Sequence, residues 1–327
     1  MNRDIADWLV GLSDPAGPGR RLPGAAPDPK QFAILCNQAE AHGVLALVLA
    51  NGADRFEAPQ LDELRQSALS RRTSMYGFSV MLRQRARALM SFRGLAKLRA
   101  TIIKGMTFAD RIYPDRALRR FTDIDVLIDP DDLDEAERAL SRLGYVLANA
   151  RPPGPLGKST CRNWVDAARG DVVVDLQVDL VHSSSVQRGV SLGYRELAGG
   201  DPTRPAALLL IALMHAAMHQ FERLIQLVDV LQAARALDDE ADFAALVDRC
   251  GAHLVAVSGL TLAGDVFAEP RCHALAARFE AIRNRRLAHW LIPPGLAVSD
   301  IERPAIATIL RRRLYRELLK QPALAAD

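Results

Sequence analysis

The stretch that decides the fold is RFTDIDVLID, residues 120–129, in which aspartates interrupt an otherwise apolar run. In a β-strand alternate side chains share a face, so Asp123 and Asp125 point the same way while Ile124 and Val126 point into a core. Two like charges side by side need a counter-ion. Closely spaced carboxylates favour a hard cation such as Mg²⁺, which keeps waters and shares its remaining positions with a nucleotide's phosphates. The pair therefore predicts a site for metal-dependent phosphate chemistry.

Composition places the chain among globular proteins. It has 327 residues, of which 49% are hydrophobic and 25% charged, enough for a sizeable core and for two or three folded units. The formal net charge is only +3, yet arginines cluster at residues 83–87 and 311–313. Such runs are usually a solvated helix face, so nucleic acid stays open as a partner without being favoured.

Cysteines and hydropathy set the expected compartment. The four cysteines, Cys36, Cys161, Cys250 and Cys272, are far apart and form no C-x-x-C pair. Their spacing therefore indicates neither a disulfide framework nor a zinc site. Residues 1–10 lack the basic start and apolar run of a signal peptide, and no later stretch is apolar enough to span a bilayer. We expect a cytoplasmic protein without a membrane partner.

Prolines, glycines and apolar periodicity divide the first half of the chain. The prolines and glycines of residues 12–30 predict an extended arm. Apolar residues recur every three or four positions from residue 31 to about 98, which predicts helices. Two short β-type runs follow at residues 98–103 and 121–128, and then a helix from Pro130 that ends at Gly144.

The second half adds strands and then helices. Tyr145 to Leu147 is predicted to be a strand, and residues 171–181 alternate with period two. One apolar helix is expected over residues 205–237, followed by further helices to about Leu324 that break at Pro293 and Pro294.

This order predicts an α+β protein with a small mixed β-sheet core flanked by helical subdomains. The expected units are an N-terminal arm and helical subdomain (1–94), a catalytic core (95–200) and a C-terminal helical subdomain (201–327).

A third carboxylate completes the proposed metal site. Nucleotidyl transfer needs two metal ions around the reacting phosphate, and three carboxylates from neighbouring strands can hold them. Asp175, in the strand at 171–181, fits that requirement together with Asp123 and Asp125. Asp171 and Asp179 share its face, but position along the strand favours Asp175.

The residues around these aspartates resemble the nucleotidyltransferases of the DNA polymerase β superfamily. Their pattern is a glycine turn followed by two aspartates that flank one hydrophobic residue, and this chain has Lys104-Gly105, Arg119, DIDVLI (123–128) and Gly144-Tyr145. The closest likeness is to a bacterial family of largely uncharacterised nucleotidyltransferases. It covers about residues 85–237, including HAAMH (215–219) and Asp229. The likeness implies a polymerase β-like sheet core.

The resemblance also implies roles for individual residues. Asp123, Asp125 and Asp175 would bind the Mg²⁺ ions, and Asp175 would also be a candidate general base. Gly105 would let the nucleotide's phosphates approach the backbone, while Lys104 and Arg119 would neutralise them.

Several residues keep two interpretations. His215 and His219 lie four apart on one helix face, which suits either a metal pair or helix packing. In the resemblance, His215 reaches the nucleotide or the acceptor, and Asp229 is an orienting or a structural carboxylate. Trp164 and His182 suit contacts to a base or an acceptor, or packing. Gln177 stands where the family often has histidine, and it can hydrogen-bond a ligand or water.

The sequence thus favours a Mg²⁺-dependent nucleotidyltransferase that moves a nucleoside monophosphate from an NTP, with ATP as the default, to a hydroxyl-type acceptor. Pyrophosphate would be released. The acceptor is left open among a small molecule, a peptide, a protein and an RNA end. The alternative is a catalytically weak or inactive member of the fold that acts as a binding or regulatory partner, antitoxin-like or accessory to a pathway.

Overall fold

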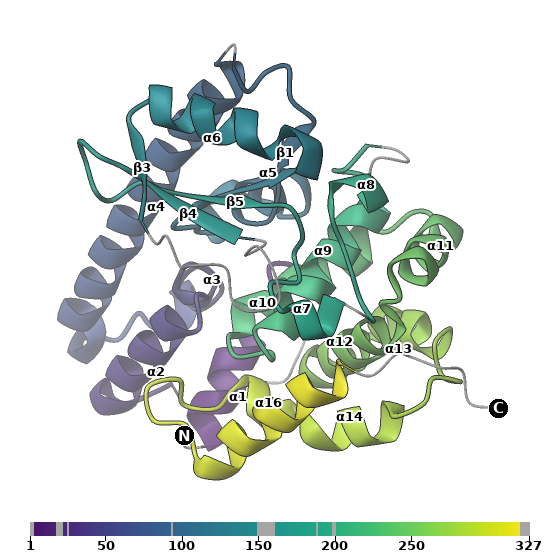
Figure 1. The fold of residues 1–327 in the computed structure, drawn as a ribbon. Helices are drawn as coiled ribbons and strands as arrows, with labels where there is room; N and C mark the ends of the chain where they lie inside the picture. The colour runs from purple at the N-terminus through teal and green to yellow at the C-terminus, as the bar shows by residue number, and fades with distance from the viewer. Residues whose placement is uncertain are drawn as a thin grey trace.

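A five-stranded mixed sheet is the centre of the part of the chain that carries the aspartates (Figure 1). The computed structural model describes residues 3–17, 22–24, 26–92, 94–148, 161–187, 189–197 and 201–320. Within them the strands are β1 (Ala100–Ile102), β2 (Ile124–Ile128), β3 (Tyr145–Leu147), β4 (Cys161–Asp166) and β5 (Val173–Gln177). Their order in the sheet is β1-β2-β5-β4-β3. The predicted α+β class with a mixed sheet is confirmed.

The only parallel pairing among these strands joins β2 to β5. Its register sets Asp125 opposite Asp175, so carboxylates from two distant parts of the chain become neighbours. Antiparallel pairing with β1 supports β2 from the other side, and the backbone N–H of Ile103 donates to the carbonyl of Asp125 at 3.0 Å.

One face of the sheet is covered by α4 (Asp62–Ser91) and α6 (Leu133–Arg142). Ile124, Val126 and Ile128 of β2 are buried there in one core with Leu82 of α4 and Leu140 of α6. Full burial of side chains of this size stabilises the fold by about 1.5–3 kcal/mol each. The predicted inward orientation of the apolar positions around the aspartate pair is therefore confirmed.

The opposite face of the sheet lies against α9 (Pro205–Met218) and α10 (Leu224–Ala236), below the sheet in Figure 1. Leu127 of β2 is buried in one core with residues of these two helices. Because residues two apart share a face, Asp125 points to the same side as Leu127. The aspartates are thus placed between the sheet and the α9–α10 pair.

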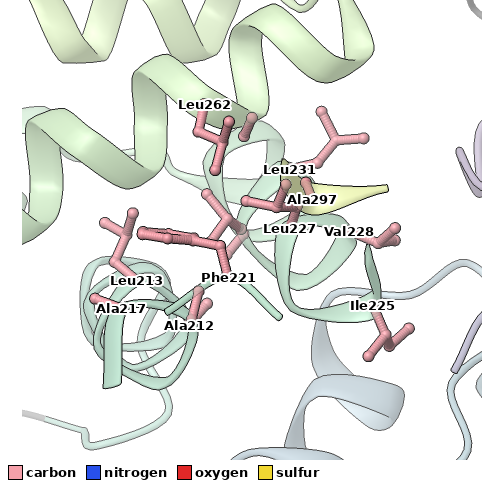
Figure 2. Close-up of a cluster of buried hydrophobic side chains, with 14 of the residues drawn as sticks. Ala212, Leu213, Ala217, Phe221, Ile225, Leu227, Val228, Leu231, Leu262 and Ala297 are labelled. Atoms are coloured by element: carbon pink, nitrogen blue, oxygen red, sulfur yellow. The ribbon is translucent and has the colours of Figure 1, made fainter. Parts of the chain in front are cut away.

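The prediction of a single helix over residues 205–237 is wrong. The chain leaves the helix after Met218 and re-enters it at Leu224, and Gln220 and Phe221 take positive φ values of 51° and 55°. Figure 2 shows Phe221 among apolar side chains of both helices, including Leu213 and Leu227. The apolar pattern continues through the break because both helices are buried on nearly all sides, so hydropathy alone does not mark it.

The remaining helices lie on either side of this framework. They are α1 (Arg3–Gly11), α2 (Pro29–Ala41), α3 (Leu45–Asn51), α5 (Gly105–Arg111), α7 (Ser184–Gln187), α8 (Tyr194–Leu197), α11 (Glu240–Cys250), α12 (His253–Phe267), α13 (Pro270–Ala277), α14 (Arg285–Leu291), α15 (Pro294–Ala297) and α16 (Ile306–Leu318). Apolar residues of α1 and α2 share one core with those of α9 to α12. The division into three units stays a prediction.

Other boundaries differ modestly from those expected. The strand predicted at 171–181 is β5, Val173–Gln177, and the one predicted at 121–128 begins at Ile124. The expected arm carries no regular element within its described residues before α2 begins at Pro29. Across the described residues, the structure has no helix with the length and hydropathy that a membrane span requires.

His42, directly after α2, joins the N-terminal helices to α10. Its Nδ1 accepts the backbone N–H of Leu224 at 3.2 Å, and its carbonyl accepts that of Ile225 at 3.1 Å. Its side chain is fully buried, and this burial lowers the pKa of His42 to about 4.

We expect the free energy of unfolding to fall as the pH drops from 7 to 4. The unfolded chain takes up a proton at His42 near pH 6.5 while the folded chain resists until about pH 4, a difference of about 3 kcal/mol. Urea unfolding across this range should show a shallower loss for His42→Gln than for the wild type. The exposed His289→Gln is the matched control, and an unchanged profile for His42→Gln would contradict the assignment.

Candidate active site

A cavity of about 380 Å³ opens between the aspartate-bearing face of the sheet and the α9–α10 turn. It is lined by residues from five separate segments, the first of them around Gly43 and the last around Arg223. The structure brings to this cavity the seven residues to which the resemblance gave a role in metal or nucleotide binding: Lys104, Gly105, Arg119, Asp123, Asp125, Asp175 and His215.

Three carboxylates share this cavity. Asp123 lies just before β2, Asp125 lies within it, and Asp175 is its register partner on β5. Burial, together with the neighbouring charge of Asp125, raises the pKa of Asp123 to about 6 and that of Asp175 to about 7. Each negative charge therefore disfavours the others, as expected where carboxylates outnumber nearby cations.

Lys104 is the cation that contacts this group. Its Nζ lies 2.9 Å from Asp125 Oδ1 and donates to Gln177 Oε1 at 3.3 Å. Gln177 in turn donates from Nε2 to Asp125 Oδ1 at 2.6 Å. Lys104 reaches this position from a backbone with φ of 55°, which is strained for a residue with a side chain. Two buried side chains, Lys104 and Gln177, thus fix the orientation of the Asp125 carboxylate.

Asp175 is held less completely. Its Oδ1 is buried and has no hydrogen-bond partner among the described residues. Buried acceptors nearly always have a donor, a water or an ion, so this oxygen lacks a partner that a bound cation would supply. As the side chains stand, no three His, Cys, Asp or Glu residues of the described chain form a ready metal site. An oxygen-only donor set with excess negative charge nevertheless fits a hard divalent cation.

Arg119 is committed to a partner inside the protein. Its Nε and Nη2 donate to the two carboxylate oxygens of Asp229, each at 2.8 Å. Asp229 is fully buried on α10 and also accepts the hydroxyl of Tyr113 at 2.8 Å. Arg119 still lines the cavity. Its ion pair with Asp229 also links the segment before β2 to α10, a structural role for Arg119 that the sequence did not reveal.

Gly105 has a packing reason to be glycine. A Cβ on this residue would lie 2.5 Å from the Cβ of Phe121, which is too close for any side chain without a shift. Close approach of phosphates to its backbone stays a prediction.

His215 and His219 lie at the end of α9 and face each other edge to face, with ring centroids 4.9 Å apart. Burial, followed by the charge of Lys104, lowers the pKa of both imidazoles, so both are neutral at pH 7. The Nδ1 of His215 has no hydrogen-bond partner among the described residues. The ring contact suits helix packing, and a metal held by this pair stays a prediction.

Other sequence candidates lie outside the cavity. Trp164 is buried in the core on the far face of the sheet, which makes it a packing residue. Asp179 accepts the backbone N–H groups of Val181 and Leu192, and Asp171 is exposed beside Arg169. These contacts leave Asp175 as the aspartate of the 171–181 segment that lines the cavity.

The arginine clusters are not continuous basic faces. Arg83 is buried and pairs with Asp110 at 2.9 Å, and Arg312 is buried near the end of the chain. Each cluster therefore loses one guanidinium to the protein interior, which weakens them as a nucleic-acid surface.

Several lining residues were missed by sequence reasoning. Arg120 and Thr122 flank the aspartates and could have been found by proximity, whereas Gly43, Glu222 and Arg223 come from loops far away in sequence. Arg223 is exposed and has no carboxylate within ion-pair distance in the described chain. Nothing in the local sequence marks Gly43 as part of the site.

A comparison with family models bears on this site directly. The model described as "Uncharacterised nucleotidyltransferase" matches residues 28–268, most of the chain. The chain belongs to this nucleotidyltransferase family. The match begins just before α2 and ends just after α12, so the nucleotidyltransferase unit includes the helices on both sides of the sheet. A search of curated proteins finds no match.

We expect Asp229→Asn to lower the free energy of unfolding by about 3–5 kcal/mol, because it leaves the buried charge of Arg119 without its partner. The double variant Arg119→Met with Asp229→Leu should lose less than the sum of the single variants. Urea unfolding of the wild type, Arg119→Met, Asp229→Leu and the double variant gives the coupling energy. Additive losses would mean that the pair does not support the fold.

Proposed function

We propose that the protein is a Mg²⁺-dependent nucleotidyltransferase that moves AMP from ATP to a hydroxyl group of an acceptor and releases pyrophosphate. The observation that carries this proposal is the convergence of Asp123, Asp125 and Asp175 on one cavity, with Asp175 Oδ1 unpartnered, in a chain of a nucleotidyltransferase family. The cavity volume of about 380 Å³ is within the range of small-molecule sites.

The three aspartates would hold the metal. When bound there, Mg²⁺ would neutralise phosphate charge and make the acceptor hydroxyl easier to deprotonate. Lys104 and Gln177 keep Asp125 in place, and the exposed guanidinium of Arg223 is available to the phosphates.

The chemical step forms one bond and breaks one. The acceptor oxygen bonds to the α-phosphorus of ATP, and the bond from that phosphorus to the bridging oxygen breaks. Pyrophosphate leaves with the electron pair, and the Asp175 carboxylate takes the hydroxyl proton before passing it to solvent.

We expect Asp123→Asn, Asp125→Asn and Asp175→Asn each to lower transfer at least about a hundredfold, because the metal supplies several kcal/mol of transition-state stabilisation. The assay is transfer of label from [α-³²P]ATP to cell extract with Mg²⁺. Asp171→Asn is the matched control, since Asp171 is exposed outside the cavity. Full transfer by a variant lacking both Asp123 and Asp125 would refute the proposal.

Calorimetric titration separates this function from the binding-protein alternative. Mg²⁺-dependent ATP binding together with transfer supports the enzyme. No Mg²⁺-dependent nucleotide binding would instead favour a regulatory member of the fold.

Removal of one crowded charge should stabilise the metal-free protein. We expect Asp175→Asn to melt a few degrees higher than the wild type in EDTA at pH 8, because the Asp175 carboxylate is disfavoured by burial and by its neighbours. Added Mg²⁺ should then raise the melting temperature of the wild type more than that of the variant. Equal responses to Mg²⁺ would argue against Asp175 as a ligand.

A further inference from the structure

A second cavity of about 410 Å³ adjoins the first. Three residues, His182, His219 and Glu222, line both cavities. The second one extends away from the aspartates toward α7 and α16, where Ser183, Val186 and Leu319 contribute to its lining. A molecule seated there would border directly on the proposed transfer site.

A strained turn, Gln220–Phe221, lies between two of the shared lining residues, His219 and Glu222. Gln220 and Phe221 both have positive φ values, which are strained for residues with a side chain. The turn holds this conformation because Phe221 is fully buried and its ring lies 5.6 Å from that of Tyr315 on α16. Backbone strain of this kind is concentrated at functional sites.

The contact with α16 also brings an arginine to the second cavity. Arg312 fastens α16 to the turn, since its Nη2 lies 3.5 Å from the carbonyl of Glu222 and 3.4 Å from that of Leu296. Arg316 lies one helical turn further on and lines the second cavity. Unlike Arg312, it is exposed and makes no hydrogen bond or ion pair with any described residue.

One cation, Arg316, and one acid, Glu222, face this cavity. Glu222 is the one acid among its lining residues, and its Oε1 lies 4.0 Å from Arg312 Nη1, so part of its charge is already balanced. His219 is neutral at pH 7 because burial lowers its pKa. The Arg316 guanidinium, which has no partner among the described residues, is therefore the group that an anion would meet. A guanidinium binds carboxylate and phosphate through paired hydrogen bonds.

We propose that the second cavity is the acceptor site, and that the acceptor is a small hydroxyl compound carrying a carboxylate or phosphate group that Arg316 binds. The hydroxyl would reach the aspartates across the boundary formed by His219 and Glu222, while the anionic group stays on α16. This inference rests on the proposed function, and it specifies the class of acceptor that the function left open.

The first test measures whether anions protect Arg316 from chemical modification, and it does not depend on enzyme activity. Phenylglyoxal modifies accessible arginines, and peptide mass spectrometry gives the rate at each position. We expect malate, which carries carboxylates, or glycerol 3-phosphate to slow modification of Arg316 at least threefold, whereas neutral glycerol has no effect. Arg313, exposed on the same helix but absent from the cavity lining, is the internal control. No protection of Arg316 by either anion at 10 mM, or equal protection of Arg313, would overturn the proposal.

The second test measures transfer from [α-³²P]ATP to small molecules of a cell extract. These are separated into anionic, neutral and cationic pools before the reaction, and each pool is assayed as acceptor. We expect label in the anionic pool only. Arg316→Ala should raise the KM for that pool at least tenfold without changing Mg²⁺-dependent ATP binding. Arg316→Lys should restore part of the loss. Arg313→Ala should resemble the wild type. Label in the neutral pool or in macromolecules would refute the acceptor class and leave the transferase function intact. No label in any pool would refute the function itself, and the protection experiment would still decide whether the cavity binds anions.

Discussion

The crowding of three carboxylates around one lysine is the constraint on which the rest of the site depends. The parallel pairing of β2 with β5 sets Asp125 opposite Asp175, and Asp123 joins them from the start of β2. Lys104 can contact only part of this charge, and it does so from a strained backbone. The apolar positions of β2 pack against α4 and α6. This packing stabilises a cluster of carboxylates whose mutual repulsion would otherwise destabilise the fold.

A second buried pair joins the two halves of the site. Arg119 precedes β2 and Asp229 lies on α10, so their ion pair holds the α9–α10 unit over the aspartates. His42 adds a similar link from the end of α2 to the start of α10. The helices beside the sheet are therefore part of the cavity wall, in agreement with a family match that extends well beyond the strands.

Much of the site followed from local sequence, and some of it did not. The alternation around Asp123 and Asp125 predicted the strand, its buried face and its charged face. Arg119 was expected to face phosphate, but its two hydrogen bonds to Asp229 depend on a residue 110 positions away, which no local pattern reveals. Gly105 suggested a phosphate turn, whereas the structure shows Phe121 in the space that a side chain would need. The helix break at Gln220 was hidden because apolar residues continue through it.

The sequence by itself determined the chemistry available to this protein: an α+β fold with acidic residues on one strand face, since strand periodicity and side-chain type are local properties. Only the tertiary structure decided how those residues are used. Which carboxylate lacks a partner, which arginine is already paired, and which cavity adjoins the aspartates all depend on contacts between distant segments. Such contacts are set by packing of whole elements, and a buried charge takes its role from the groups that packing brings beside it.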